Sequence, residues 1–281
     1  MNAVTEEKAL LSLLQGVDFP PCPAVLLAVD AELKKETPDQ REIARHISTD
    51  VALSGCLMQV ANSPAFSTGR PLNSITQALQ ILGTQQVFNL LVTQLLKVAL
   101  SGAPDVSLDR FWDSSAQTAR LAAELARRLR CVRPDVAYTF GLFHDCGIPL
   151  LMKRFPQARA ALAEANVADE QSFTEVEERH LGTNHAVVGY FLARRWHLPS
   201  FVAEGILHHH DYRLLAEPGR VSEDVKRLIS IVVLAEHIIR LQAGDHGEQE
   251  WHKAASVACE SLGLSLAAID DLIEDMCEWL A

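Results

Sequence analysis

The segment Leu-Ala-Ala-Glu-Leu-Ala-Arg-Arg-Leu at residues 121–129 carries the pattern that decides the fold. Its apolar residues, among them Leu121, Leu125 and Leu129, share one face of a helix because positions three or four apart are neighbours on a helical surface. The same spacing marks residues 75–82 and much of the remaining chain. Continuous period-2 alternation and the Asn-Gly or Asp-Gly signals of hairpins are absent from the sequence. The pattern predicts an all-α fold of roughly a dozen helices.

Several helix boundaries are marked by residues that cap helices. Residues 172–175, Ser-Phe-Thr-Glu, form a capping box, in which the serine and glutamate satisfy each other's free backbone N–H groups. Thr37 supplies a capping hydroxyl ahead of Pro38, which suits the first helical position. Gly263 is expected to end one helix before the last one begins near Ser265.

One loop predicts a division of the chain. Residues 101–105, Ser-Gly-Ala-Pro-Asp, form the clearest loop, and ten of the eleven histidines follow it, with only His46 before it. We therefore expect an N-terminal helical bundle at residues 1–104, packed against an HD-like helical bundle at residues 105–281. The final helix of this second part is amphipathic and acidic, and it either caps the domain or docks a partner.

Charge and composition exclude several classes of protein. The 281-residue chain is 48% hydrophobic and 22% charged, which is typical of a globular protein with a sizeable core. Its formal net charge of -11 disfavours binding to nucleic acids and to anionic membranes. The nearest thing to a basic run, the arginines at 127, 128, 130 and 133, reads as the C-terminal end of a helix, where positive charge is favourable.

The lack of a recognisable targeting signal and the pattern of the cysteines predict a cytoplasmic location. Residues 1–8 are polar and acidic, unlike a signal peptide, and no apolar run approaches the roughly 20 residues that span a bilayer. The six cysteines form no Cys-x-x-Cys pair and have apolar flanks, which is typical of core thiols in a reducing compartment.

The histidines form the one group of residues that points to chemistry. His144 and Asp145 follow the apolar stretch 138–143, His185 lies in a helical segment, and residues 208–210 are three consecutive histidines. Imidazole nitrogen and carboxylate oxygen are suitable ligands for iron, manganese or zinc. We therefore predict a shared polar site, although buried histidines more often serve as hydrogen-bonded core residues, and a site of this kind does not require a metal.

A group of short segments, spread over roughly residues 19–240, carries a family resemblance. Each segment alone is weak, but together they resemble the HDOD family of bacterial signalling proteins, which are relatives of the HD phosphohydrolases. The segments are Phe19 to Ala24, Ile47 to Leu53, Val60 to Phe66, Ser74 to Gly83, Gly141 to Gly147, Glu178 with Gly182 and His185, Trp196 to Pro199, and His208 with His209.

The resemblance implies a metal site that is incomplete. HD phosphohydrolases bind one or two metals through a first His, a His-Asp pair, further His residues and a final Asp. The matching residues here are His144, Asp145, His185, His208 and His209, with Glu236 at the place of the final Asp. Ser114 stands where the first His is expected, and Pro149 stands where active members commonly have Lys. Because serine is a poor metal ligand, any binding of Fe, Mn or Zn should be weak.

Three functions are compatible with these observations. The first, favoured by Ser114, is a non-catalytic output module of bacterial signal transduction that binds other signalling proteins or a small nucleotide. The second is a metal-dependent phosphohydrolase acting on a nucleotide or cyclic dinucleotide, because metal-activated water is the usual nucleophile of such sites. The third is a redox or scaffold protein, suggested only by Cys146 beside the His-Asp pair.

Overall fold

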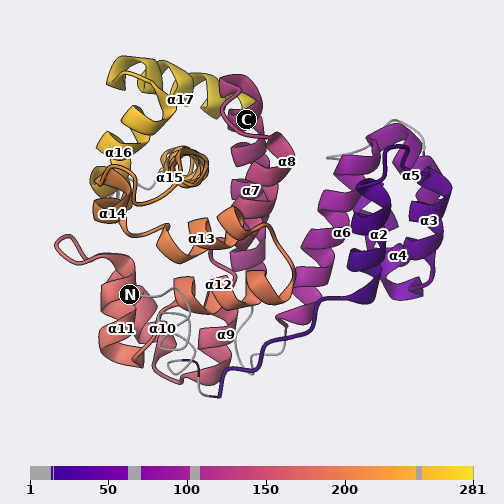
Figure 1. Ribbon diagram of the computed structural model, residues 1–281, viewed down its shortest axis with the longest axis horizontal. Coiled ribbons are helices and arrows are strands. Elements are labelled where there is room, and N and C mark those ends of the chain that lie inside the picture. Colours follow the sequence, from indigo (N-terminus) through magenta and orange to yellow (C-terminus); the bar gives the residue numbers. More distant parts are fainter. Residues whose placement is uncertain (1–13, 15, 63–70, 102–107, 245–248, 281) are drawn as a thin grey trace. The chain divides into compact units, whose positions relative to one another are not determined.

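The structure is a computed structural model that describes residue 14 and residues 16–62, 71–101, 108–244 and 249–280. All regular secondary structure within these ranges is helical (Figure 1), so the predicted all-α fold is confirmed. Among the same residues, no helix combines the length and the apolar character that crossing a membrane would require.

The chain forms two compact units. The first comprises residues 20–101, and the second comprises residues 102–281 together with the N-terminal residues through Phe19. The described residues before Pro20, which are residues 14 and 16–19, thus group with the histidine-rich unit. The predicted loop at 101–105 lies outside the described residues except for Ser101.

The first unit is a bundle of helices capped by polar side chains. The Asp39 carboxylate accepts a hydrogen bond from the Arg41 N–H at 2.8 Å, so Asp39 caps the helix, rather than the predicted Thr37. The helices of this unit are α2 (Ala24–Leu33), α3 (Gln40–Ser48), α4 (Val51–Ala61), α5 (Ile75–Leu82) and α6 (Thr84–Ala99). Asp50 caps α4 and Ser74 caps α5 in the same way as Asp39 caps α3.

The second unit surrounds helix α15 (Glu223–Gln242), whose side chains are buried over most of its length. Helices α7, α8, α13, α16 and α17 all contact α15 (Figure 1). A helix enclosed in this way needs apolar residues around its circumference, and the run from residue 228 to 235 provides them. The other helices are α7 (Asp109–Leu129), α8 (Pro134–Phe143), α9 (Gly147–Arg154), α10 (Ala158–Ala165), α11 (Phe173–Leu181), α12 (His185–Arg195), α13 (Ser200–His208), α14 (Tyr212–Ala216), α16 (Gln249–Leu262) and α17 (Leu266–Leu280).

Two of the predicted boundaries are confirmed in this unit. Ser172 and Glu175 form the capping box at the start of α11, with the Ser172 Oγ accepting from the Glu175 N–H at 3.2 Å. Gly263 separates α16 from α17 with a φ of 66°, a left-handed conformation that glycine adopts without steric cost. Helix α17 buries Ile269 and Met276 and contacts α15.

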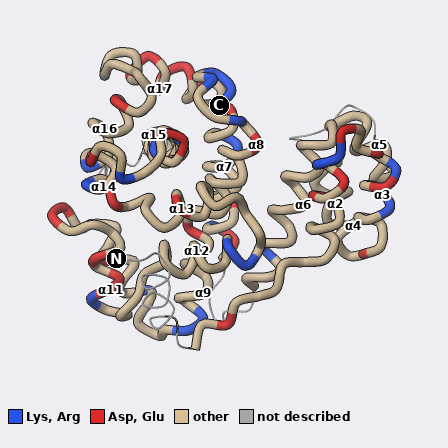
Figure 2. Tube along the Cα trace, viewed as in Figure 1, with Lys and Arg blue, Asp and Glu red and all other residues tan. Residues whose placement is uncertain are grey.

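Basic and acidic residues are interspersed over both units (Figure 2). Arg127 and Arg128 belong to the last turn of α7, as predicted, and both pair with Glu124, at 2.6 and 2.9 Å. These arginines therefore form local ion pairs at the end of a helix, where the helix dipole favours their charge.

Helices α9 and α12 approach each other so closely that only glycine fits at the contact. A Cβ atom on Gly147 would lie 2.1 Å from the carbonyl oxygen of His185 and 2.9 Å from the Gly189 nitrogen. Both neighbours are backbone atoms, so they cannot move aside as a flexible side chain would. The contact fixes the start of α9 against the start of α12, and both helix starts carry residues of the candidate site.

We expect Gly147→Ala to destabilise the protein by at least about 1–3 kcal/mol, the range for overpacked cores, because the added methyl group displaces backbone. Gly55→Ala serves as the control, since nothing lies within 4 Å of a Cβ at that position of α4. Alanine has the higher helix propensity, so Gly55→Ala should stabilise its helix by about 0.5–1 kcal/mol. Urea unfolding measures both changes, and equal effects of the two substitutions would contradict the close contact.

Candidate functional site

The His-Asp pair and His185 lie at helix ends. His144 follows the last residue of α8, and Asp145 lies in the turn that leads into α9. The apolar stretch 138–143 forms the end of a buried helix, and the pair lies just beyond that end. His185 is the first residue of α12, which Asn184 caps by accepting a hydrogen bond from the Val187 N–H at 2.8 Å.

The remaining groups come from α13 and α15. Helix α13 ends at His208, so His209 and His210 stand in the turn after it, while Glu236 lies on the long helix α15. Helix α13 contacts α8, α12 and α15. The packing of these helices therefore brings together side chains that are separated by up to 92 positions in the sequence.

The carboxylate of Asp145 lies between three imidazole rings. Its Oδ1 is 3.2 Å from Nε2 of His185 and 3.4 Å from Nε2 of His209, and its Oδ2 is 3.4 Å from Nε2 of His144. The Nε2 atoms of His185 and His209 are 3.1 Å apart. Glu236 adds a second carboxylate, whose Oε1 is 3.0 Å from Nε2 of His144. The structure thus brings together five of the six residues that the sequence proposed for the site.

The three rings point Nε2 inward because each Nδ1 is hydrogen-bonded elsewhere. The Nδ1–H of His144 donates to the carbonyl of Gly141 at 2.9 Å, and that of His209 donates to the carbonyl of Ile206 at 2.7 Å. Each carbonyl belongs to the residue three positions earlier, in the last turn of the ring's own helix. The bond made by Nδ1 fixes the orientation of the ring, so Nε2 is the nitrogen that faces the cluster in both rings.

His185 obtains its Nδ1 partner from another helix. The Oε2 atom of Glu177 on α11 accepts a hydrogen bond from Nδ1 at 2.6 Å and a second from the backbone N–H of His185 at 3.0 Å. Both side chains are 0% exposed. A carboxylate behind an imidazole in this way is the usual arrangement around metal-binding histidines.

The buried charges of His144 and Asp145 stabilise each other. Burial by itself lowers the pKa of His144, but the carboxylates of Asp145 and Glu236 outweigh it and hold that pKa well above its usual range. Burial by itself raises the pKa of Asp145, but the His144 charge and hydrogen bonds from the imidazoles hold that pKa well below its usual range. His144 is therefore an imidazolium and Asp145 a carboxylate at neutral pH.

His185 and His209 differ in charge although they are adjacent. At His185 burial is outweighed by Glu177 and Asp145, and the pKa rises to about 10. At His209 burial and the nearby His210 together lower the pKa to about 3. The neutral His209 thus accepts a hydrogen bond at Nε2 from the charged His185 ring, whose Nε2 is 3.1 Å away.

This donor set fits a divalent cation. Two groups of ligand atoms each lie within 4.8 Å of one another, and Asp145 belongs to both: His144, Asp145 and Glu236 form one, and Asp145, His185, His209 and His210 form the other. Two protons, on His144 and His185, offset the carboxylates at the centre of this cluster. A divalent ion that replaced both protons would leave the net charge unchanged and would meet nitrogen and oxygen ligands of the kind that transition metals prefer.

His210 joins the site in place of His208. The Nδ1 of His210 lies 2.7 Å from Oε2 of Glu250 on α16, and its ring stacks on Phe173 with the ring centroids 4.9 Å apart. His208 belongs to neither group of ligand atoms and lines the adjacent pocket. The structure thus does not bring His208 together with the other residues that the sequence proposed, and its assignment as a ligand stays a prediction.

The departures from the HD pattern have separate structural roles. Ser114 is exposed on α7 and belongs to neither ligand group. Pro149 is buried in the first turn of α9, where backbone N–H groups have no partner within the helix, so proline is tolerated. Burial raises the pKa of the Cys146 thiol, which lies 4.0 Å from the Gly189 carbonyl oxygen. A raised thiol pKa disfavours the thiolate and with it the redox hypothesis.

Sequence reasoning missed Glu177 and Glu250, the two carboxylates that hold His185 and His210. The resemblance pointed to the neighbouring residue Glu178, but that side chain is on the exposed face of α11 and accepts from Asn184 Nδ2 at 2.6 Å. The helical stripe could have separated the two, because Glu177 follows Phe173 and Val176 on the buried face.

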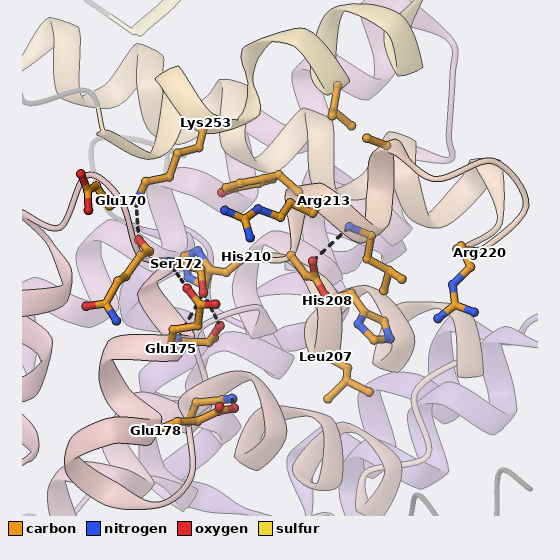
Figure 3. A pocket seen from close by; sticks show the side chains of 18 of the residues that line it. Glu170, Ser172, Glu175, Glu178, Leu207, His208, His210, Arg213, Arg220 and Lys253 are labelled. Atoms are coloured by element: carbon orange, nitrogen blue, oxygen red, sulfur yellow. Dashed lines mark hydrogen bonds between the residues drawn. The ribbon is translucent and has the colours of Figure 1, made fainter. Parts of the chain in front are cut away.

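A pocket of 1180 Å³ opens beside the site (Figure 3). Its wall includes His208 from the end of α13 and His210 from the turn that follows, together with Arg213 and Lys253. The Lys253 ammonium donates to the carbonyls of Ala168 and Gln171, at 2.7 and 2.9 Å, and to Glu250 at 3.0 Å. Lys253 therefore ties the loop before α11 to α16.

Comparison with known proteins identifies the family of the chain. The model of the HDOD domain family matches residues 19–212. The chain belongs to the HDOD family. Among relatives, this HDOD chain is 27% identical over 234 residues to an uncharacterized protein of Treponema pallidum (strain Nichols), covering 81% of the chain but only 43% of that relative. The chain thus spans less than half the length of this curated relative.

Solved structures resemble the HDOD chain over nearly its full length. An HDOD domain protein with unknown function from Geobacter sulfurreducens is 27% identical with a TM-score of 0.73, covering 99% of this chain and 95% of that one. A putative phosphohydrolase from Shewanella amazonensis SB2B is 23% identical with a TM-score of 0.71, covering 94% of each chain. A putative signal transduction protein from Marinobacter aquaeolei VT8 is 18% identical with a TM-score of 0.77, covering 99% of this chain and 64% of that one. The latter two establish similarity of fold alone.

We expect Asp145→Asn to destabilise the metal-free protein by about 3 kcal/mol, as when one partner of a buried ion pair is removed, because the His144 and His185 charges lose their shared carboxylate. Asp224→Asn is the control, since that side chain is 68% exposed and lies in the first turn of α15. The control should change stability by no more than about 0.5 kcal/mol. The free energy of unfolding, measured in urea with a chelator present, distinguishes the two. An Asp145→Asn protein as stable as the control would show that the cluster is not coupled as described.

Proposed function

We propose that this HDOD protein is an output module of bacterial signal transduction that binds a divalent transition metal in the Asp145 cluster. In this proposal it acts by binding other signalling proteins or a small nucleotide, and not by turnover. The observation that carries it is the convergence of three inward-facing Nε2 atoms on the Asp145 carboxylate, at 3.2 to 3.4 Å. The cluster is therefore a built site and not a chance accumulation of core histidines.

Two groups of residues would hold such an ion. Asp145, His185 and His209 offer one oxygen and two nitrogens, with His210 as a further nitrogen, and imidazole ligands of this kind suit Fe, Mn or Zn. His144 and Glu236 form the second group with Asp145. A bound ion would supply a Lewis-acid centre that holds an anionic group of a ligand in the adjacent pocket.

One feature favours binding over catalysis. The HD position that should supply the first imidazole carries Ser114, whose side chain is exposed, so the group of His144, Asp145 and Glu236 has one imidazole only. Efficient hydrolysis needs a metal-activated water held between well-defined ligands, and a three-residue group with two carboxylates holds an ion less firmly.

The alternative, a phosphohydrolase acting on a nucleotide or cyclic dinucleotide, is favoured by the pocket beside the cluster. Arg213 lines that pocket together with His210, and guanidinium groups bind phosphate through paired hydrogen bonds. The cytoplasmic location expected from the sequence suits both functions.

We expect the two adjacent histidines to differ in their effect on metal binding. His210→Gln should weaken the binding of Zn²⁺ or Mn²⁺ by at least the roughly 10–100-fold loss that follows removal of a supporting group. His208→Gln should leave the affinity unchanged within about twofold, because His208 belongs to neither ligand group. Isothermal titration calorimetry of both full-length variants measures this. A greater loss for His208→Gln would restore the original assignment of that residue.

We expect no substantial turnover of cyclic or linear dinucleotides by the purified protein with added Mn²⁺ or Fe²⁺. The physical reason is the absent imidazole at position 114, which leaves the second group short of a ligand. Chromatographic detection of linearised or hydrolysed product gives the measurement, and Asp145→Ala provides the background rate. Turnover that this substitution abolishes would favour the hydrolase alternative over the binding module.

A further inference from the structure

The carboxylate of Glu177 is buried with one partner. Its side chain is 0% exposed, its Oε2 accepts both hydrogen bonds from His185, and its Oε1 has no hydrogen-bond partner among the described residues. The single ion pair that the described residues give it is also with His185. A buried carboxylate with an unpaired oxygen is costly, so a purely structural role would be served better by an apolar residue.

The position of His185 in its helix explains why a partner from another helix is required. His144 and His209 follow the ends of their helices, so a carbonyl three residues earlier accepts from Nδ1 in each case. His185 is the first residue of α12 and has no earlier turn of that helix behind it. Its Nδ1 needs an acceptor from elsewhere, and α11 supplies Glu177 eight positions before it.

The two hydrogen bonds of one oxygen constrain the ring in two ways. The bond from the backbone N–H ties the first residue of α12 to α11, at 3.0 Å. The bond from Nδ1 at 2.6 Å sets the rotation of the ring, which leaves Nε2 directed at Asp145 Oδ1, 3.2 Å away. Because a carboxylate has no proton to donate, it holds the ring proton on Nδ1, whereas an amide can donate to Nδ1 instead.

We propose that Glu177 is a positioning residue that keeps a proton on Nδ1 of His185 and so reserves Nε2 as a ligand for a divalent transition metal. The metal part rests on the proposed function, while the choice of ring nitrogen does not. Among the described residues, the hydrogen bonds of the Glu177 side chain go to His185 and not to Asp145 or the other imidazoles. Glu177 therefore acts through His185.

The experiment compares Glu177→Gln with the unaltered full-length protein. Co²⁺ titration, followed by visible absorption, reports both affinity and ligand geometry. We expect Glu177→Gln to bind Co²⁺ roughly 10–100-fold more weakly, with altered absorption bands, as when a hydrogen-bonding partner of a metal ligand is removed. Glu274→Gln, an exposed position on α17, makes the same charge change and should leave both unchanged. Equal Co²⁺ affinity and spectrum for a folded Glu177→Gln protein would overturn the proposal.

A second measurement separates this proposal from the proposed function. Nitrogen-correlated proton spectra of the metal-free protein should show a strongly hydrogen-bonded proton on Nδ1 of His185, which Glu177→Gln removes or leaves more weakly hydrogen-bonded. An unchanged Nδ1 signal would overturn the proposal, even where Co²⁺ binds to neither protein. If the unaltered protein keeps the expected Nδ1 signal but fails to bind Co²⁺, the metal function fails and the choice of ring nitrogen stands.

A third variant covers the case in which Glu177→Gln does not fold. Glu177→Asp keeps the charge but shortens the side chain by one methylene, so it reaches His185 less well. We expect Glu177→Asp to bind Co²⁺ more weakly than the unaltered protein, but by less than about 10-fold. Unaltered affinity in Glu177→Asp, together with a displaced Nδ1 signal, would show that the position of the carboxylate does not matter and would overturn the proposal.

Discussion

The carboxylate of Asp145 is the point on which the second unit of this HDOD protein depends. Its oxygens lie within 3.4 Å of imidazole nitrogens from three different segments, and each of those imidazoles is buried. Without a negative charge at this place, the protonated His144 and His185 would stand in the interior with less compensation. Two residues later, Gly147 lets the backbone of α9 meet that of α12. The short turn after α8 therefore sets the charge balance of the site and the spacing of the helices around it.

The orientation of the imidazoles follows from where each one lies in its helix. A histidine that follows a helix end finds an acceptor in the last turn of its own helix, so its ring orientation is settled locally. A histidine at a helix start has no such acceptor and depends on a residue of a different helix. This explains why His185 depends on Glu177. His210, two residues beyond the end of α13, also has a partner from another helix, Glu250 of α16.

The two groups of ligand atoms that share Asp145 differ in how well they are supported. The retained part, centred on Asp145, His185 and His209, is the better supported by hydrogen bonds to buried partners. The altered part, with Glu236 and the exposed Ser114, is more open to solvent. The two groups that share Asp145 therefore differ in burial and in the number of imidazoles that they contain.

Much of this protein was determined by local sequence. Helical spacing established the all-α class, because amphipathic stripes such as that at residues 121–129 can bury their apolar face only as helices. The capping box at Ser172 and the stop at Gly263 were also predicted, since caps depend on a few adjacent residues. The His-Asp pair and His185 could be named in advance because a family pattern preserves ligand types and their spacing.

The tertiary structure alone decided the details on which the chemistry depends. Nothing local distinguishes His208 from His210, because the directions of side chains after a helix end follow from how α13 packs against its neighbours. The choice of Glu177 over Glu178 is a question of which face of α11 is buried, and the pairing of His210 with Glu250 joins residues 40 positions apart. Hydrogen-bond partners, buried charge and ring orientation are properties of the packed state, so they were fixed only when distant helices came together.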